Sequence, residues 1–180
     1  MSTTTEAAQR TELTGEYADL HEQLAHLRHF LRFTTRDLTD EQVGLRTTAS
    51  ELCLGGLIKH VTAVERAWVA FARGDHGVME WNPEDTAVMA ERDAEFRMLP
   101  GETLAGVLGE YAVVAAGTDE LLASRPDLDE VHPLPDAPWF EKGKSWSTRR
   151  VLLHIAAETA QHAGHADIIR EAIDGAKSMG

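Results

Sequence analysis

The sequence lacks most features that mark secreted, membrane-spanning or nucleic-acid-binding proteins. Its single cysteine, Cys53, excludes an intrachain disulfide and a cysteine-based zinc cluster. Lys and Arg number 17 against 30 Asp and Glu, and this formal charge of −13 argues against binding to nucleic acid or to an anionic membrane. No apolar run approaches the roughly 20 residues that a membrane span needs, and the N-terminus has no signal-peptide pattern. We therefore expect a cytoplasmic protein.

The chain does contain enough apolar material for a core, together with an excess of histidine. Hydrophobic residues make up 43% of the 180 positions, which is typical of a globular protein. The nine histidines are many for this length, and several of them fall in one short segment. We expect residues 1–10 to form a flexible N-terminal arm and residues 11–180 to form a single helical domain.

Four segments carry the apolar periodicity of amphipathic helices. In the first, leucines recur in steps of three and four and leave Arg28 outside the apolar stripe. Ser50 and Ser147 are expected N-caps of the second and fourth segments, and Gly175 is an expected stop. Four such helices in one domain predict an all-α fold, a four-helix bundle with long connecting loops. The segments are residues 11–34, 50–73, 102–124 and 148–176.

Two connections, residues 75–99 and 125–147, are longer than a simple bundle requires, and loops of this length are often functional. We expect a short extra helix at about residues 84–95 and no strand. Trp81, Trp139 and Trp146 lie in these connections, where they either pack or form a wall for a ligand.

Gly55 and Gly56 lie inside the second predicted helix, where each costs about 1 kcal/mol relative to alanine. Two such glycines indicate close approach by another backbone or by a ligand. Cys53, just before them, is expected to be a small core residue.

The fourth predicted helix carries His154, Glu158, His162 and His165, spaced four, four and three residues apart. At about 100° per residue they fall within roughly 80° of one another, on the arc that also holds apolar side chains. Burying several imidazoles and a carboxylate is costly unless something satisfies them. A divalent metal ion does so directly, because imidazole nitrogens and carboxylate oxygens are its ligands.

A third ligand must come from another helix, and His60, on the apolar stripe of the second helix, is the obvious donor. Glu158 and His162 with His60 form one set, but His154 with Glu158, or His162 with His165, would serve as well. Spacing leaves these sets open. Without a metal, Glu158 would instead pair with histidinium in a buried polar network.

The other histidines carry less information. We expect His21, His26 and His29 to belong to a solvated face of the first helix, and His76 and His132 lie in the long connections.

At residues 54–68, which include His60, and at residues 145–175, the sequence resembles the DinB-like superfamily of metal-binding four-helix bundles. The resemblance covers almost the whole chain. The run from Glu158 through His162 and His165 to Asp167 looks like the branch that includes mycothiol-dependent maleylpyruvate isomerase and mycothiol S-transferases. It implies that His60, Glu158 and His162 hold the metal, and that His154 and His165 lie beside the metal or on the substrate side.

The resemblance further implies a divalent metal cofactor, with zinc first and nickel, iron or manganese also accepted by such ligands. It implies a low-molecular-weight thiol, mycothiol or similar, as cosubstrate for S-transfer to a small electrophile, with His165 and His154 moving the proton or orienting a ligand. A homodimer is expected as well. The isomerase has an additional C-terminal domain, whereas this sequence ends at Gly180 after the fourth helix, so isomerase activity is not expected.

Two other functions remain open at this point. One is a non-catalytic metal- or small-molecule-binding bundle of the stress-response type, and the other is hydrolysis by metal-bound water. In each case the expected partner is a small molecule, with no nucleic acid and no membrane.

Overall fold

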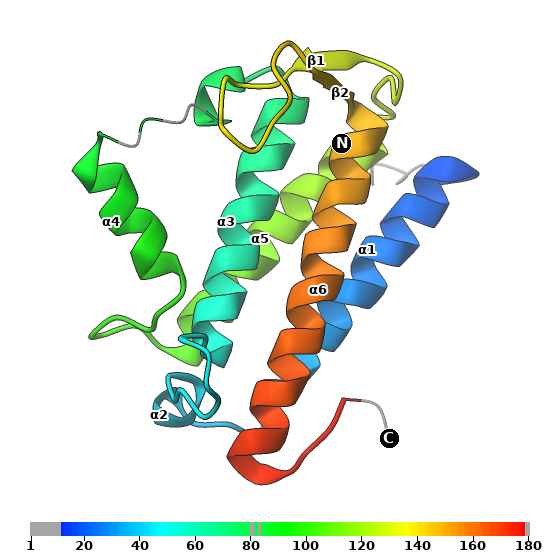
Figure 1. Ribbon diagram of the computed structural model, residues 1–180. Coiled ribbons are helices and arrows are strands. Elements are labelled where there is room, and N and C mark those ends of the chain that lie inside the picture. The colour runs from blue at the N-terminus through cyan, green and yellow to red at the C-terminus, as the bar shows by residue number, and fades with distance from the viewer. Residues whose placement is uncertain (1–11, 80–81, 83, 179–180) are drawn as a thin grey trace, which may run out of the picture.

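The computed structural model of the chain describes residues 12–79, 82 and 84–178 (Figure 1), and this part is mostly helical. The predicted all-α class is therefore confirmed, whereas the expected N-terminal arm lies outside the described residues. None of the described helices has the length and apolar character that crossing a membrane requires. The helices are α1 (Glu16–Phe33), α2 (Asp40–Val43), α3 (Leu54–Ala72), the 3-10 helix η1 (His76–Met79), α4 (Thr86–Glu95), α5 (Leu104–Ala123) and α6 (Thr148–Asp174).

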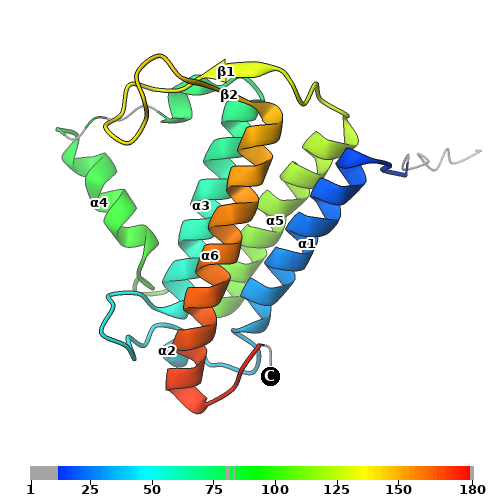
Figure 2. The same ribbon diagram turned by 45° about the vertical axis from the view of Figure 1, so that its right-hand side comes forward.

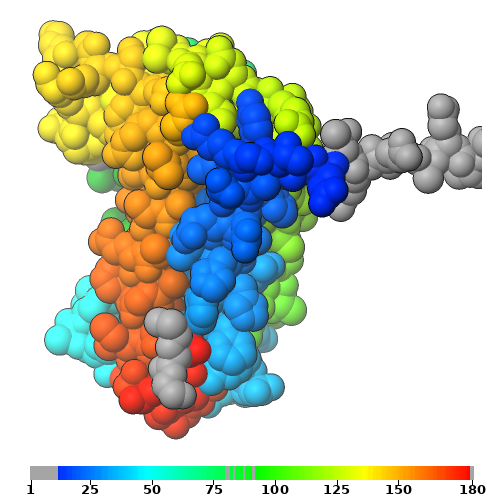
Figure 3. Space-filling view, turned by 90° about the vertical axis from the view of Figure 1, so that its right-hand side faces the viewer, coloured from blue at the N-terminus to red at the C-terminus, as the bar shows by residue number. Residues whose placement is uncertain are grey.

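The four long helices α1, α3, α5 and α6 lie side by side and form what we call the helical core (Figures 1 and 2). Helix α6 packs against α1 and α3, and α5 packs against α3 and α1. Figure 3 shows the face on which α1 lies along α6. The largest fully buried apolar side chains come from all four helices and include Leu24, Phe71, Tyr111 and Ile155.

The helix ends agree with the sequence prediction at α6 and differ at α3. The Ser147 hydroxyl accepts a hydrogen bond from the Arg150 N–H, and Gly175 ends α6 in the left-handed conformation with φ 79°. Helix α3 begins at Leu54 rather than near Ser50, because Cys53 is the N-cap and its sulfur accepts a hydrogen bond from the Gly56 N–H at 3.4 Å. Cys53 is also buried, as expected.

Helix α4 lies apart from the helical core along most of its length, and the chain returns to α3 just after it (Figures 1 and 2). The expected helix at residues 84–95 is observed from Thr86 to Glu95. An added Cβ at Gly56 would lie 2.1 Å from the carbonyl oxygen of Phe96, and one at Gly55 would lie 2.3 Å from the sulfur of Met98. Gly56 thus admits another backbone, which is one of the two expected reasons for the glycines, whereas Gly55 admits the Met98 side chain.

The second long connection contains a short antiparallel pair of strands, β1 (Val131–Pro133) and β2 (Ser145–Ser147), that the sequence analysis did not predict. Each strand has only three residues, too few for an alternating apolar pattern to be visible. The pair lies at the end of the helical core where α6 begins (Figure 1).

A set of polar side chains lies inside the helical core. Arg28 belongs to it, so the expected position of Arg28 outside the apolar stripe is wrong. Arg28 is 2% exposed, and its guanidinium has Nε 3.3 Å from Glu65 Oε2 and Nη1 2.8 Å from Asp119 Oδ1. The Thr118 hydroxyl donates a further hydrogen bond to Glu65. Arg28 turns inward because the fully buried Glu65 carboxylate on α3 requires a cation. We call Arg28, Glu65, Thr118 and Asp119 the arginine cluster.

Candidate metal centre

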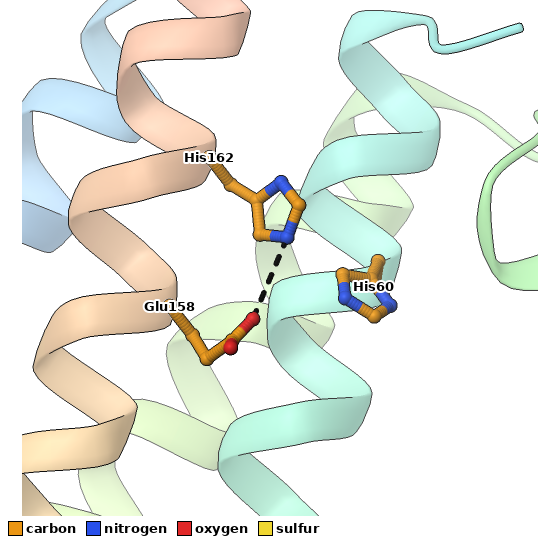
Figure 4. Close-up of side chains that lie close together, drawn as sticks. All are labelled: His60, Glu158 and His162. Carbon is orange, nitrogen blue, oxygen red and sulfur yellow. Dashed lines mark ion pairs between the residues drawn. The ribbon is translucent and has the colours of Figure 1, made fainter. Parts of the chain in front are cut away.

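Neighbouring helices α3 and α6 bring three predicted side chains together. His60 projects from α3, while Glu158 and His162 project from α6 one turn apart (Figure 4). One ligand atom from each residue lies within 4.8 Å of the others. We call these three residues the His–Glu–His site. It is the set that the family resemblance implied, and the ligand role of each residue stays a prediction.

The distances within the site are close to those that one small cation imposes. His162 Nε2 lies 3.6 Å from Glu158 Oε2 (Figure 4), whereas neighbouring ligands on a tetrahedral zinc ion are about 3.3 Å apart for bonds of about 2 Å. The imidazole rings of His60 and His162 meet edge to face with centroids 4.9 Å apart. Small side-chain adjustments would therefore let all three residues bind one ion.

The electrostatics of the site favour a neutral imidazole beside a carboxylate. Burial, together with the nearby His60, lowers the pKa of His162 to about 4, although Glu158 opposes the shift. A neutral imidazole keeps the lone pair that a metal ion needs. Glu158 lies 3.9 Å from His154 and 3.6 Å from His162, both longer than a hydrogen bond. This donor set fits a divalent cation.

Each candidate histidine ligand is held through Nδ1. His60 Nδ1 lies 3.1 Å from Glu95 Oε2, and His162 Nδ1 lies 3.4 Å from His165 Nδ1. The His60 ring also stacks on Phe96, with centroids 4.2 Å apart. Sequence reasoning missed Glu95 and Phe96. Their only signal was the pair of glycines in α3, which predicted an approaching segment without saying which one.

A cavity of about 470 Å³ lies beside the site, and His60, His154 and Glu158 form part of its wall. The apolar part of the wall comes from α3, η1, α4 and the connection between the strands, and includes Trp68, Met79, Val88, Trp139 and Phe140. Trp146 does not line the cavity but stacks on Trp68 with centroids 4.7 Å apart. Trp81, the third tryptophan of the long connections, lies outside the described residues.

The two predicted catalytic histidines occupy different places. His154 lines the cavity and contacts the rings of Trp68 and Trp146 at centroid distances of 4.9 and 5.0 Å. Burial lowers its pKa, and Glu158 partly opposes this shift. His165 is not part of the described cavity wall and lies against His162 instead. Only His154 is therefore placed to meet a molecule in the cavity.

The remaining histidines lie away from the site. His26 and His29 are exposed on α1, as expected, and His21 is half-buried, 3.7 Å from Asp119. His132 is buried with its Nδ1 3.3 Å from His76 Nε2, a pairing that the sequence did not indicate.

Comparison with known proteins bears on the fold and on the family of the chain. Among solved structures, a conserved protein from Enterococcus faecalis matches with a TM-score of 0.67 over 91% of this chain and 100% of its own, at 12% sequence identity. At that identity the likeness concerns the fold alone. No curated protein matches the chain. The family model of mycothiol S-transferases matches residues 19–175. The chain therefore belongs to the mycothiol S-transferase family, within the DinB-like superfamily.

Proposed function

We propose that the protein is a metal-dependent enzyme that transfers a low-molecular-weight thiol, mycothiol or a close relative, to a small electrophile. The observation that carries this proposal is the convergence of His60, Glu158 and His162 within 4.8 Å beside an aromatic cavity. Family membership supports the thiol. We further propose that residues 11–180 form one DinB-like four-helix bundle, which the packing of the four long helices supports.

In this proposal His60, Glu158 and His162 bind the divalent ion, most readily zinc, although nickel, iron and manganese accept the same ligands. Three protein ligands leave room for a further group, as in catalytic rather than structural sites. The ion, when bound, lowers the pKa of a coordinating thiol so that thiolate is present at neutral pH. The thiol must come from outside, because Cys53 is buried at the start of α3 with its sulfur 3.6 Å from the Phe96 carbonyl oxygen.

His154 is the proposed proton acceptor. Its Nε2 lies 3.9 Å from Glu158 Oε1 at the edge of the cavity, and its lowered pKa keeps the ring neutral at physiological pH. The thiol S–H bond breaks as the proton passes to His154, and the sulfur forms a bond to the electrophilic carbon. The leaving group departs with its electron pair, and His154 then releases the proton to water.

The apolar wall formed by Trp68, Trp139 and Phe140 would hold the electrophile against the reacting sulfur. His165, which lies 3.4 Å from His162 Nδ1, is proposed to orient the His162 ring rather than to touch substrate.

The test is a thiol-transfer assay with mycothiol and an aryl halide electrophile, followed by absorption spectroscopy of the cobalt-substituted protein. Thioether formation that requires the metal, together with a thiol-dependent change in the cobalt spectrum, is the expected result. A cobalt spectrum that does not change when thiol is added to the metal-loaded protein would contradict the proposal and favour the non-catalytic binding function.

We also propose a cytoplasmic homodimer. Exposed apolar side chains on two of the long helices, Val113 on α5 and Ile168 on α6, support contact with a second copy. Analytical ultracentrifugation tests it, and a monomer at micromolar concentration would contradict it.

A further inference from the structure

The contact between α4 and the His–Glu–His site has a consequence for metal binding. We propose that Glu95 is a positioning residue that fixes the tautomer and orientation of His60, so that His60 presents Nε2 to the metal. The proposal rests on the metal site of the proposed function. It assigns a role to the C-terminal end of α4, which reaches the site from outside the four long helices.

The hydrogen bond between the two side chains determines which nitrogen is free. Glu95 Oε2 lies 3.1 Å from His60 Nδ1, and an ionised carboxylate can only accept. The proton of the neutral imidazole is therefore on Nδ1, which leaves the lone pair on Nε2. Glu95 is not itself one of the converging ligands. It acts through His60, as carboxylates commonly do behind metal-binding histidines.

A second contact fixes the plane of the ring. Phe96, the next residue, stacks on His60 with an interplanar angle of 26° and centroids 4.2 Å apart. The imidazole is thus held by a hydrogen bond in its plane and by an aromatic face above it. Together the two contacts restrict rotation about both side-chain torsions of His60.

The segment that carries both residues is anchored to α3 by contacts that hold its backbone. The Lys59 ammonium donates to the carbonyl oxygens of Ala94 at 3.1 Å and Arg97 at 2.8 Å. The Phe96 carbonyl rests directly on Gly56, where a methyl group would not fit. These backbone contacts lie before and after Glu95 in the chain. The backbone of Glu95 is therefore held in place against α3.

His162 has a contact at the corresponding nitrogen, but its partner is an imidazole, which can donate or accept. Its Nδ1 lies 3.4 Å from His165 Nδ1, and its Nε2 lies on the side of Glu158. The two candidate histidine ligands therefore both have Nδ1 in contact with a residue outside the ligand set, Glu95 for His60 and His165 for His162.

The first measurement needs no metal. Nitrogen-15 NMR of the metal-free protein at about pH 8, above the ordinary titration range of histidine, reports which nitrogen of His60 carries the proton, and His60→Ala identifies the signal. We expect the Nδ1–H tautomer in the native protein and in Glu95→Gln, whose amide oxygen still accepts. In Glu95→Ala we expect the Nε2–H tautomer that free histidine favours.

The second measurement is zinc affinity by competition with a chromogenic chelator. Glu95→Ala should weaken binding by about 10- to 100-fold, and Glu95→Gln by less, because the hydrogen bond remains while the charge is lost. Asp93→Asn, an equal loss of charge on the exposed side of α4, is the matched control and should leave the affinity unchanged.

Two results would overturn the proposal: an Nε2–H tautomer of His60 in the native protein, or the same zinc affinity in native and Glu95→Ala proteins. A native protein that binds no zinc but holds the Nδ1–H tautomer through Glu95 would instead overturn the proposed function and retain the positioning of His60. A merely structural role for Glu95 would lower stability without moving the tautomer.

Discussion

Two polar clusters interrupt the apolar interior of this protein, and they are satisfied in different ways. The arginine cluster supplies its own cation, because Arg28 pairs with both Glu65 and Asp119. The His–Glu–His site brings together only electron-pair donors, with a carboxylate beside an imidazole that burial keeps neutral. The first cluster is complete without a ligand, whereas the second gains a partner only from outside. A polar group in the core indicates a binding site when it gathers metal-ligating atoms without a cation among them.

The largest expected effect comes from breaking the complete cluster. Arg28→Ala leaves the fully buried Glu65 carboxylate without its cation, and the free energy of unfolding should fall by about 3–5 kcal/mol. Urea denaturation measures the change. Arg66→Ala, which removes an exposed pair with Glu110, is the control and should cost less than about 1 kcal/mol. Equal losses in the two variants would contradict the distinction between the clusters.

The second cluster should behave in the opposite way. We expect His162→Ala to lower the stability of the metal-free protein far less than Arg28→Ala does, but to abolish stabilisation by metal. At a free zinc concentration of about 100 times its Kd, the native protein should gain about 3 kcal/mol and the variant none. Thermal unfolding with and without zinc measures this gain, and His21→Ala, which changes a half-buried histidine of α1 away from the site, should retain it. A variant that gains as much as native protein would show that the ion binds elsewhere.

The stability of the metal-free protein should depend on pH because His162 is buried as a neutral imidazole. The folded pKa of His162 is about 4 against 6.5 for the ordinary group, so the unfolded chain binds more protons between these values. Stability should therefore be complete above about pH 6.5 and fall as the pH drops toward 4, by about 1–3 kcal/mol. The measurement is the urea midpoint of the native and His162→Ala proteins across this pH range. The variant should lack the decrease in stability that protonation of His162 causes in the native protein.

The smallest effects concern the segment that approaches the site. Gly56→Ala places a methyl group against the Phe96 carbonyl and should cost about 1–3 kcal/mol by overpacking, with weaker zinc binding because Glu95 and Phe96 shift. Gly109→Ala, in α5 with open space around it, is the matched control and should gain about 0.5–1 kcal/mol from helix propensity. If Gly56→Ala is equally well tolerated, the segment is not firmly anchored.

Much of the candidate metal site was visible in the sequence, because it depends on spacing along single helices. The i, i+4 pair Glu158 and His162 falls on one face of any α-helix, and Ser147 and Gly175 mark the ends of α6 by local chemistry. His60 could be proposed as a partner since it lies on an apolar stripe. The choice of Glu158 and His162 as the partners of His60, rather than another pair on the same face, came from the family resemblance.

The rest depends on contacts between segments far apart in the chain. Arg28 looked like a surface residue, because the periodicity of α1 does not reveal a buried carboxylate on α3. Glu95 carried no signal either, since its partner is 35 residues away and the glycines of α3 did not identify what approaches them. The start of α3 was misplaced because Cys53 is an unusual N-cap.

The central claim is that His60, Glu158 and His162 bind one divalent ion. Elemental analysis of protein that was never exposed to a chelator tests it most directly. The account predicts about one ion per chain in the native protein and almost none in His162→Ala. Less than about a tenth of an ion per native chain would contradict it.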